Sequence, residues 1–275
     1  MENWWINGRP GRHIDVADRG FTYGDGLFET IAVRNGEARF LALHLDRLLG
    51  GCARLRIAAP ERAGLQASLA AAALGIRHGV LKLIVTRGAG PRGYGLPAEQ
   101  SATVVWGTMD SEPRPSGPIE IRWCETMVSV NPATAGLKTL GRLEQVLARA
   151  EWTAAQVVEG LMTTIDGQLI GGTSSNVFVV AGNRVLTPAL HRAGVAGVMR
   201  RVVMAEARRD GIELVETALT PFEVHDATEL FVSNALTGIR PVCRLDSRTF
   251  TVGPVTRRLR ELLVAAGVGE CAEAS

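Results

Sequence analysis

Residues 131–152 read NPATAGLKTLGRLEQVLARAEW, an irregular stretch followed by apolar residues at helical spacing, with Lys138 at the junction. The pattern predicts a loop and then a helix over residues 142–157. Leu137 and Leu140 lie close to the lysine, so burial and the positive end of the helix dipole would both disfavour its protonated form. An unprotonated lysine is the nucleophile that carbonyl chemistry requires, and Lys138 is therefore a candidate Schiff-base residue.

The chain contains 28 arginines and two lysines, so a mechanism that needs a primary amine has two candidates. Lys82 lies inside the apolar stretch VLKLIV, which reads as a buried strand. In a strand, an inward-facing amine needs a partner, and an outward-facing one is simply solvated. We therefore expect Lys138 to be the stronger nucleophile, although a solvated lysine beside a helix is its ordinary alternative.

The composition is that of a chain of 275 residues, 46% hydrophobic, with a net charge of +2. This length suits one large domain or two modest ones. The basic and acidic residues nearly balance and form no dense block, which disfavours nucleic-acid binding. No long apolar run or signal-peptide pattern is present, so we expect a soluble, cytoplasmic protein that does not bind membranes. The four widely spaced cysteines indicate isolated thiols rather than a metal site or a disulfide framework.

Hairpins, two helices and two strands are predicted for residues 1–108. Short apolar runs flank the Asn-Gly turns at residues 7–8 and 35–36, which is typical of hairpins. Helical spacing extends over Leu41–Leu55 and over the alanine-rich stretch Pro60–Ile76, where the proline suits the start of a helix. The strands VLKLIVTRG and ATVVWGTM follow, separated by the loop GAGPRGYGLP, which can present side chains to a site.

Residues 109–118, MDSEPRPSGP, are charged, rich in proline and without periodicity, and we expect an interdomain linker there. The prediction is thus an α+β (α/β two-domain) fold. Its N-terminal α/β domain comprises residues 1–108. Its C-terminal α/β domain comprises residues 119–275 and carries Lys138.

The C-terminal domain is expected to combine strands and helices. Helices are predicted at residues 194–211, GVAGVMRRVVMAEARRDG, and at Pro254–Ala266. Gly197 precedes the first of these helices, so the amides of Val198 and Met199 could bind an anion there, although a glycine before a helix is common. Strands are predicted at 119–127 and near Leu161, Val177, Val185, Leu214, Phe231 and Val242.

Five separated motifs, taken together, are similar to those of one enzyme family. They are YGDGLFET, the helix with Arg47, the PRGY loop, the Lys138 segment and GVAGVMR. In order and spacing they resemble the fold type IV family of pyridoxal-phosphate enzymes, which includes branched-chain aminotransferases, D-amino acid aminotransferases and 4-amino-4-deoxychorismate lyases. The resemblance implies their fold, pyridoxal 5′-phosphate as cofactor, a small-molecule substrate and a homodimer. Taken alone, Arg47 beside His44 and Asp46 would be an ordinary surface ion pair.

Within this family the chain most resembles the lyases, which release pyruvate from aminodeoxychorismate to form 4-aminobenzoate for folate synthesis. The segments NPATAGLKTLGRLEQVLARAEW and TRGAGPRGYG carry this similarity. Thr30 supports it, because branched-chain aminotransferases have glycine at this point and D-amino acid aminotransferases an apolar residue. A threonine is also an ordinary strand former, so D-amino acid or branched-chain aminotransferase activity stays open as the alternative.

The resemblance implies roles for individual residues. Lys138 would bond to the cofactor and then move protons, with a proton relayed through Thr30. Arg92 and Tyr94 would face a substrate carboxylate, and Tyr23 would line the pocket. The other positions implied to contact the cofactor are Arg47, Gly197, Val198, Met199, Asn234, Ala235 and Gly171.

Gly171, in the stretch DGQLIGGTSSNVF, departs from the family pattern, which has a glutamate that pairs with the pyridine nitrogen of the cofactor. Thr139 and Gly141 also differ from the residues common in the lyases. Without the carboxylate, the cofactor ring should accept electrons less readily. Three interpretations follow: a lyase driven by the release of pyruvate, an aminotransferase, or a degenerate cofactor-binding paralogue. We expect the variant Gly171→Glu to separate them.

Overall fold

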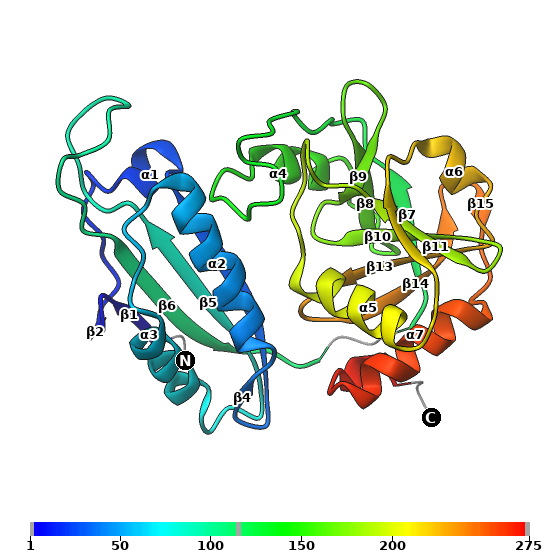
Figure 1. Cartoon of the computed structure of the whole chain (residues 1–275), viewed down its shortest axis with the longest axis horizontal. Coiled ribbons are helices and arrows are strands. Elements are labelled where there is room, and N and C mark those ends of the chain that lie inside the picture. Colours follow the sequence, from blue (N-terminus) through cyan, green and yellow to red (C-terminus); the bar gives the residue numbers. More distant parts are fainter. Residues whose placement is uncertain (1–2, 114–116, 273–275) are drawn as a thin grey trace. The chain divides into compact units, whose positions relative to one another are not determined.

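The computed structural model describes residues 3–113 and 117–272, and it contains the helices and sheets that an α+β fold requires (Figure 1). The described residues form two compact units. Unit 1 runs to Pro113 and also includes Leu137–Gly141. Unit 2 contains the other described residues. The predicted fold class is therefore confirmed.

Unit 1 is built on an antiparallel sheet of six strands in the order β2-β1-β6-β5-β3-β4. Helix α2 (Leu41–Leu55) lies across one face of this sheet (Figure 1). Its apolar side packs on Leu27, Ile31 and neighbouring strand residues, which form the core of the unit. The other elements are β1 (Asn3–Ile6), β2 (Arg9–Pro10), α1 (Arg19–Tyr23), β3 (Gly26–Arg34), β4 (Glu37–Ala38), α3 (Arg62–Ala73), β5 (His78–Thr86) and β6 (Thr103–Asp110).

Side chains alternate along β3 and so divide between the two faces of the sheet. Leu27 and Ile31 belong to the core beneath α2, and Glu29 points the same way. Phe28 and Thr30 therefore point to the opposite face. Thr30 pairs directly with Lys82 of β5, which places these two side chains together on that face.

The segment Leu137–Gly141 pairs with the start of β3, where β4 offers no partner. The Phe28 amide donates to the Lys138 carbonyl at 3.0 Å, and the Leu140 amide donates to the Gly26 carbonyl at 3.0 Å. Leu137 is buried in the core of unit 1. Lys138 therefore belongs to unit 1, which differs from the expectation that the C-terminal domain carries it. The reason is that an open strand edge is satisfied by a segment distant in the sequence.

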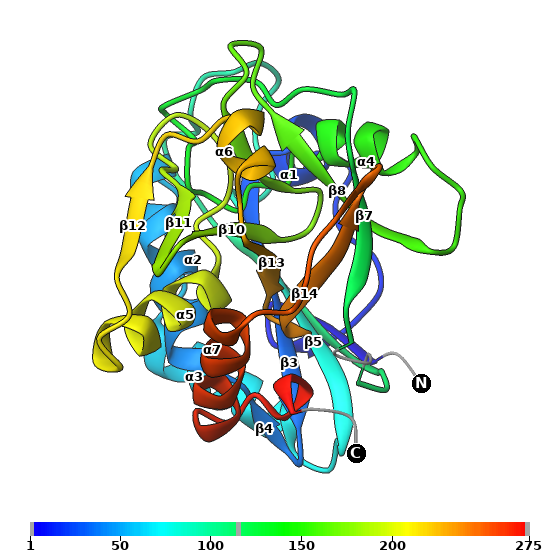
Figure 2. The same cartoon turned by 90° about the vertical axis from the view of Figure 1, so that its right-hand side faces the viewer.

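Unit 2 contains a mixed sheet of nine strands in the order β12-β11-β10-β13-β14-β7-β8-β9, with β15 paired to β14. Helices α5 (Val198–Arg209) and α7 (Pro254–Ala265) pack side by side against β13 and β14 (Figure 2). The remaining elements are β7 (Ile119–Trp123), α4 (Leu143–Arg149), β8 (Val157–Thr163), β9 (Leu169–Gly172), β10 (Asn176–Ala181), β11 (Arg184–Pro188), β12 (Leu214–Thr217), α6 (Pro221–His225), β13 (Glu229–Asn234), β14 (Gly238–Leu245), β15 (Arg248–Thr249) and the 3₁₀ helix η1 (Gly269–Cys271).

The helix predicted over residues 142–157 is too long. Helix α4 ends at Arg149, and β8 already begins at Val157. Between them Trp152 is buried, and its indole N–H donates to the Val157 carbonyl at 2.9 Å. The Glu151 carboxylate accepts the amides of residues 125 and 126, each at 2.8 Å. These tertiary contacts end the helix in spite of its local pattern.

Other differences from the predicted elements are small. Helix α3 begins at Arg62 rather than at Pro60, because the Glu61 carboxylate accepts the amides of the first turn and acts as the N-cap. Strand β6 continues to Asp110, so the expected linker at 109–118 begins inside a strand, and residues 114–116 of that linker lie outside the described residues. The sequence analysis did not predict the short elements α1, β9, α6, β15 and η1. Among the described helices, none has the length and apolarity to span a membrane.

Candidate functional site

Both lysines of the chain contact the ring of Phe28 on the face of the unit 1 sheet opposite α2. The Lys138 Nζ atom lies 4.3 Å from the ring centre, and the Lys82 Nζ atom lies 3.7 Å from it. Backbone pairing explains the arrangement, because Lys138 lies beside Phe28 on one side of β3 and Lys82 lies on β5 on the other side. An ammonium group over an aromatic face is stabilised by the ring quadrupole.

Thr30 also faces this cluster. The Lys82 ammonium donates a hydrogen bond to Thr30 Oγ1 at 3.4 Å. Burial lowers the pKa of Lys82 to about 8, although the charge of Glu29 opposes the shift. The sequence predicts that Lys82 is either partnered or solvated, and in the structure its amine has Thr30 as a partner and shares the Phe28 ring with Lys138. No local pattern could have shown this, because the contact depends on the register between β3 and β5.

A buried ion cluster lies on the other face of β3. The Glu29 side chain is 1% exposed and accepts a bidentate pair from Arg47, Nε to Oε1 at 2.8 Å and Nη2 to Oε2 at 2.5 Å. His44 Nδ1 lies 2.6 Å from Glu29 Oε2. Burial alone would raise the pKa of Glu29, but hydrogen bonds from His44 and Arg47 outweigh it and lower the pKa. Burial lowers the pKa of His44. Because the Glu29 carboxylate can only accept, Nδ1 is the donor in this contact.

This cluster fixes the orientation of Arg47. Its side chain is 14% exposed, so the surface ion pair with its neighbours on the helix is not the arrangement observed. Glu29 was not singled out from the sequence, where it reads as an ordinary charged residue in a strand. Its position one residue before Thr30 places it on the opposite face and under α2.

The start of α5 on unit 2 presents backbone amides. Gly197 is the N-cap, and no side chain of the described residues caps this helix. A Cβ at Gly197 would lie 2.0 Å from Asn176 Oδ1, so any larger residue would have to displace the Asn176 side chain. The Asn176 amide group donates to the Val195 carbonyl at 2.9 Å and holds this loop. The amides of Val198 and Met199 lie in the first helical turn, where backbone N–H groups lack helical partners.

Asn234 and Ala235 lie at the turn between β13 and β14. Asn234 Oδ1 accepts three hydrogen bonds, from the amides of Leu236 and Thr237 and from the Thr237 hydroxyl, each at 3.0 Å. The side-chain oxygen of Asn234 therefore stabilises the turn. The implied cofactor contact of these two residues stays a prediction.

Gly171 lies on β9 in a tight turn. Its φ is +157°, and a Cβ there would lie 2.9 Å from the Ser175 carbonyl oxygen. The neighbouring amide of Gly172 donates to the same oxygen at 2.8 Å. Any side chain at position 171 therefore requires a shift of the backbone. The variant Gly171→Glu tests this turn as well as the chemistry, so a loss of activity would not separate the three interpretations.

A buried carboxylate stabilises the same turn. Glu159 is 4% exposed and accepts six hydrogen bonds, from the amides of Gly160, Thr173 and Ser174 and from the hydroxyls of Thr173, Ser174 and Ser175. These bonds occupy both carboxylate oxygens. Glu159 is thus a structural residue and not a replacement for the glutamate missing at position 171. The sequence feature that could have indicated this role is a single glutamate in an apolar strand, followed further along the chain by a Thr-Ser-Ser run of hydrogen-bond donors.

The PRGY loop is anchored to α1 of its own unit. Arg19 Nη1 donates to the Gly93 carbonyl at 2.9 Å, and the Gly93 amide donates to the Tyr23 hydroxyl oxygen at 3.0 Å. The rings of Tyr23 and Tyr94 lie 5.5 Å apart, so the structure brings these two predicted residues together. Tyr94 is 87% exposed, and Arg92 is also exposed.

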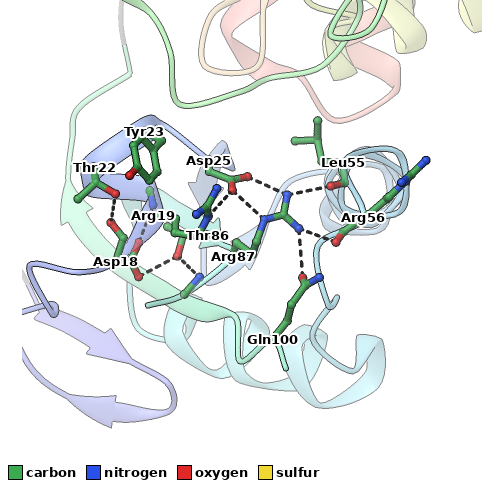
Figure 3. A network of polar contacts seen from close by, with 12 residues as sticks. Asp18, Arg19, Thr22, Tyr23, Asp25, Leu55, Arg56, Thr86, Arg87 and Gln100 are labelled. Atoms are coloured by element: carbon green, nitrogen blue, oxygen red, sulfur yellow. Dashed lines mark hydrogen bonds and ion pairs between the residues drawn. The ribbon is translucent and has the colours of Figure 1, made fainter. Parts of the chain in front are cut away.

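A polar network below this loop makes its base rigid (Figure 3). The Arg87 guanidinium binds both carboxylate oxygens of Asp25, at 2.7 and 2.9 Å, and donates to the Arg56 carbonyl at 2.6 Å. Arg19 Nε donates to the same Asp25 carboxylate at 3.0 Å. Thr86 joins the network through Asp18 at 2.9 Å. The loop is therefore exposed at its tip and fixed at its base.

Comparison with known proteins places these features in context. A sequence model of the amino-transferase class IV family matches residues 26–245. The crystal structure of a 4-amino-4-deoxychorismate lyase from Pseudomonas aeruginosa has a TM-score of 0.89 and 42% identity, and the match covers 95% of this chain and 98% of that chain. An aminodeoxychorismate lyase from Vibrio harveyi is 32% identical over 266 residues, 94% of this chain and 98% of that protein. A D-alanine aminotransferase from Listeria monocytogenes is 27% identical over 283 residues, 96% of this chain and 94% of that protein.

Proposed function

Because the chain belongs to the class IV aminotransferase family, whose members depend on pyridoxal 5′-phosphate, we propose that it is a 4-amino-4-deoxychorismate lyase. The reaction releases pyruvate and forms 4-aminobenzoate. One observation carries the proposal: Lys138 and a hydroxyl, Thr30, are on the same sheet face, linked by contacts to Phe28 and Lys82. Aminotransferases need a lysine of this kind, but the elimination also needs a proton for the leaving group.

Each unit, taken by itself, has groups of the kind that this cofactor needs. On unit 1, the Lys138 amine would bond to the aldehyde, and Arg47, oriented by Glu29, would contribute positive charge for an anion. On unit 2, the uncapped α5 N-terminus with its glycine suits a phosphate group, which the amides of Val198 and Met199 would bind. Bound pyridoxal phosphate supplies an electron-withdrawing ring joined to the substrate nitrogen.

Lys138 and Thr30 would share the proton transfers. The Lys138 amine would remove the proton from the ring carbon that bears the substrate amino group. The carbon–oxygen bond to the neighbouring enolpyruvyl group then breaks, its electron pair leaves with the oxygen, and the ring becomes aromatic. Thr30 Oγ1 accepts from Lys82, so its own hydrogen can pass to the departing oxygen. The proton that Lys138 removed from the ring carbon would then restore the Thr30 hydroxyl. The enolpyruvate so formed rearranges to pyruvate.

The alternative function is that of an aminotransferase, which Gly171 and the similarity to a D-alanine aminotransferase both allow. A D- or branched-chain aminotransferase would convert an amino acid to its keto acid without releasing pyruvate from aminodeoxychorismate. Glu159 cannot replace the missing carboxylate, because its oxygens are occupied by the turn. Elimination is helped by aromatisation and transamination is not, so the loss of the carboxylate is better tolerated by a lyase.

The first experiment is a titration with pyridoxal phosphate, followed by borohydride reduction and mapping of the modified lysine. We expect a saturable visible absorption band and a label on Lys138. Aminodeoxychorismate is then supplied, and pyruvate is measured with a lactate dehydrogenase assay. Lys138→Ala should abolish both the label and pyruvate release, whereas Arg184→Ala, a change at an exposed surface pair, should alter neither.

Two results would overturn the proposal. Pyruvate release by Lys138→Ala at nearly the wild-type rate would exclude the mechanism. Conversion of a D- or branched-chain amino acid by a protein that releases no pyruvate would identify an aminotransferase.

The resemblance also supports a cytoplasmic homodimer, which we propose as the functional form. Large apolar side chains are exposed around α1 of unit 1, including Val16 at 78% and Phe21 at 70%. A second subunit would cover such groups. Light scattering after gel filtration should give twice the mass of the chain, and a monomer that is fully active would contradict the proposal.

A further inference from the structure

Lys82 occupies an unusual place for a charged side chain. Its neighbours in β5, Leu81 and Leu83, are fully buried in the core of unit 1, so the lysine points to the opposite face of the sheet. On that face it is flanked by Thr30 of β3 and by Gly107 of β6. The ring of Trp4 covers Gly107 so closely that a Cβ there would lie 2.5 Å from the ring. Lys82 therefore lies between the Phe28 ring and the Thr30 hydroxyl, and Trp4 covers the neighbouring strand position on the same face.

No carboxylate of the described residues forms an ion pair with Lys82. Its amine contacts the Phe28 ring at 3.7 Å and the Thr30 hydroxyl at 3.4 Å. A half-buried ammonium with such weak partners is less stable than an apolar side chain of the same length would be. Burial lowers the pKa of Lys82, which shows the same cost. A ligand carboxylate would remove this cost.

The position of Lys82 relative to Lys138 indicates which carboxylate of a substrate Lys82 would bind. Both Nζ atoms contact the same ring, so they lie at most about 8 Å apart. A substrate whose amine reacts at Lys138 therefore brings its neighbouring substituents close to Lys82. In aminodeoxychorismate the carbon next to the amine carries the enolpyruvyl ether, which ends in a carboxylate. Amino acid substrates of aminotransferases share only the α-carboxylate, which is on the carbon that bears the amine, and have no second carboxylate in common on the next carbon.

We propose that Lys82 binds the enolpyruvyl carboxylate of the substrate and thereby selects dicarboxylates that carry an amine. This inference rests on the proposed function, since it identifies the group that distinguishes the lyase substrate. A charge-assisted hydrogen bond from a desolvated ammonium is strong, so the contact contributes substantially to binding. The same contact orients the ether oxygen toward Thr30, which Lys82 also contacts.

The test uses two probes, of which only one has this carboxylate, and compares the effect of each variant on each probe separately. Chorismate carries both a ring carboxylate and the enolpyruvyl carboxylate, and 4-aminobenzoate carries the ring carboxylate alone. Their dissociation constants are measured by calorimetry with the pyridoxal-phosphate-loaded wild type and the variants Lys82→Met, Lys82→Gln and Lys82→Arg. Met109→Leu, a volume-conserving change on β6, serves as the matched control. Circular dichroism and thermal unfolding confirm that each variant is folded.

We expect the Kd of chorismate to rise at least tenfold in Lys82→Met and Lys82→Gln, while that of 4-aminobenzoate changes less than twofold. Lys82→Arg should restore most of the affinity, because it keeps the charge. Kinetics with aminodeoxychorismate should show a matching increase in KM. If Lys82 had a purely structural role, its replacement would instead weaken the binding of both probes equally, or it would lower the melting temperature and leave both Kd values unchanged.

The outcomes distinguish this inference from the proposed function. If the wild type releases pyruvate but Lys82→Met binds chorismate as tightly, the role of Lys82 is excluded and the lyase function stands. If the wild type releases no pyruvate yet binds chorismate through Lys82, the lyase function fails and the dicarboxylate site stands. If the wild type neither releases pyruvate nor binds chorismate, both are overturned.

Discussion

Replacement of Glu29 by glutamine should destabilise unit 1 strongly. The carboxylate is 1% exposed and accepts hydrogen bonds from Arg47 and His44. Glutamine has nearly the same shape but no charge. Its NH₂ group is itself a donor, and it would face a group that now donates to the carboxylate, from Arg47 or from His44. Removing one partner of a buried ion pair costs about 3 kcal/mol. For a chain of this size, we expect the melting temperature to fall by roughly 6 to 12 °C.

The assay is thermal unfolding of the wild type and of Glu29→Gln at several pH values. The matched control is Glu213→Gln, because Glu213 pairs with Arg184 at 2.8 Å while both side chains are more than half exposed. Such a surface pair contributes at most about 1 kcal/mol. The control should therefore shift the melting temperature by a fraction of the effect at Glu29.

The pH dependence follows from the two lowered pKa values. The pKa of Glu29 is lower in the folded protein than its ordinary value of 4.5. Its charged form therefore stabilises the fold fully above pH 4.5, and this stabilisation is lost as the pH falls through the folded-state pKa. The lowered pKa of His44 acts in the same direction below its ordinary 6.5, because the unfolded chain takes up that proton first. The wild type should thus lose stability on acidification, and Glu29→Gln should lose less. Equal melting temperatures for the wild type and Glu29→Gln at pH 7 would refute the reasoning.

Two further predictions concern glycines of unit 2. Gly197→Ala should weaken pyridoxal phosphate binding at least tenfold in an absorbance titration, because its Cβ would collide with Asn176 Oδ1 at the α5 N-terminus. Gly50→Ala, with open space around its Cβ inside α2, is the control and should bind normally; equal affinity of both variants would contradict the role of the α5 N-terminus. Gly171→Glu should lower the melting temperature without raising activity, because its Cβ would lie 2.9 Å from the Ser175 oxygen. A clear gain of activity with unchanged thermal stability would show instead that the turn accepts a side chain and that the absence of the carboxylate limits activity.

The family and the fold class could be predicted from the sequence because they depend on patterns that are local in the chain. Helix α2 matches its predicted bounds, Leu41–Leu55, since apolar residues at helical spacing decide where it packs. The Asn-Gly turns led to the hairpins for a similar reason, because few residues adopt their backbone angles. Lys138 was predicted from its residue type, its apolar neighbours and the resemblance of its segment, and its role stays a prediction.

Length and termination of elements depended on contacts that the local pattern does not contain. The helix after Lys138 stops at Arg149 because the buried Trp152 and the Glu151 carboxylate bond to residues outside it. Gly171 appeared from the sequence to be a missing carboxylate. In the structure it is also a position where the turn beneath Ser175 leaves no room for a Cβ.

The sequence by itself determined the family of this protein and its cofactor, and it predicted the lysine that should react, because these depend on residue types in an ordered set of motifs within one chain. Only the tertiary structure decided what surrounds that lysine. Strand register places Lys82 beside Thr30, and an open strand edge joins Lys138 to Phe28. The alternation of side chains puts Glu29 and Arg47 on the far side of the same strand. Register and edge pairing are set by the burial of whole faces of a sheet, which no short stretch of sequence specifies.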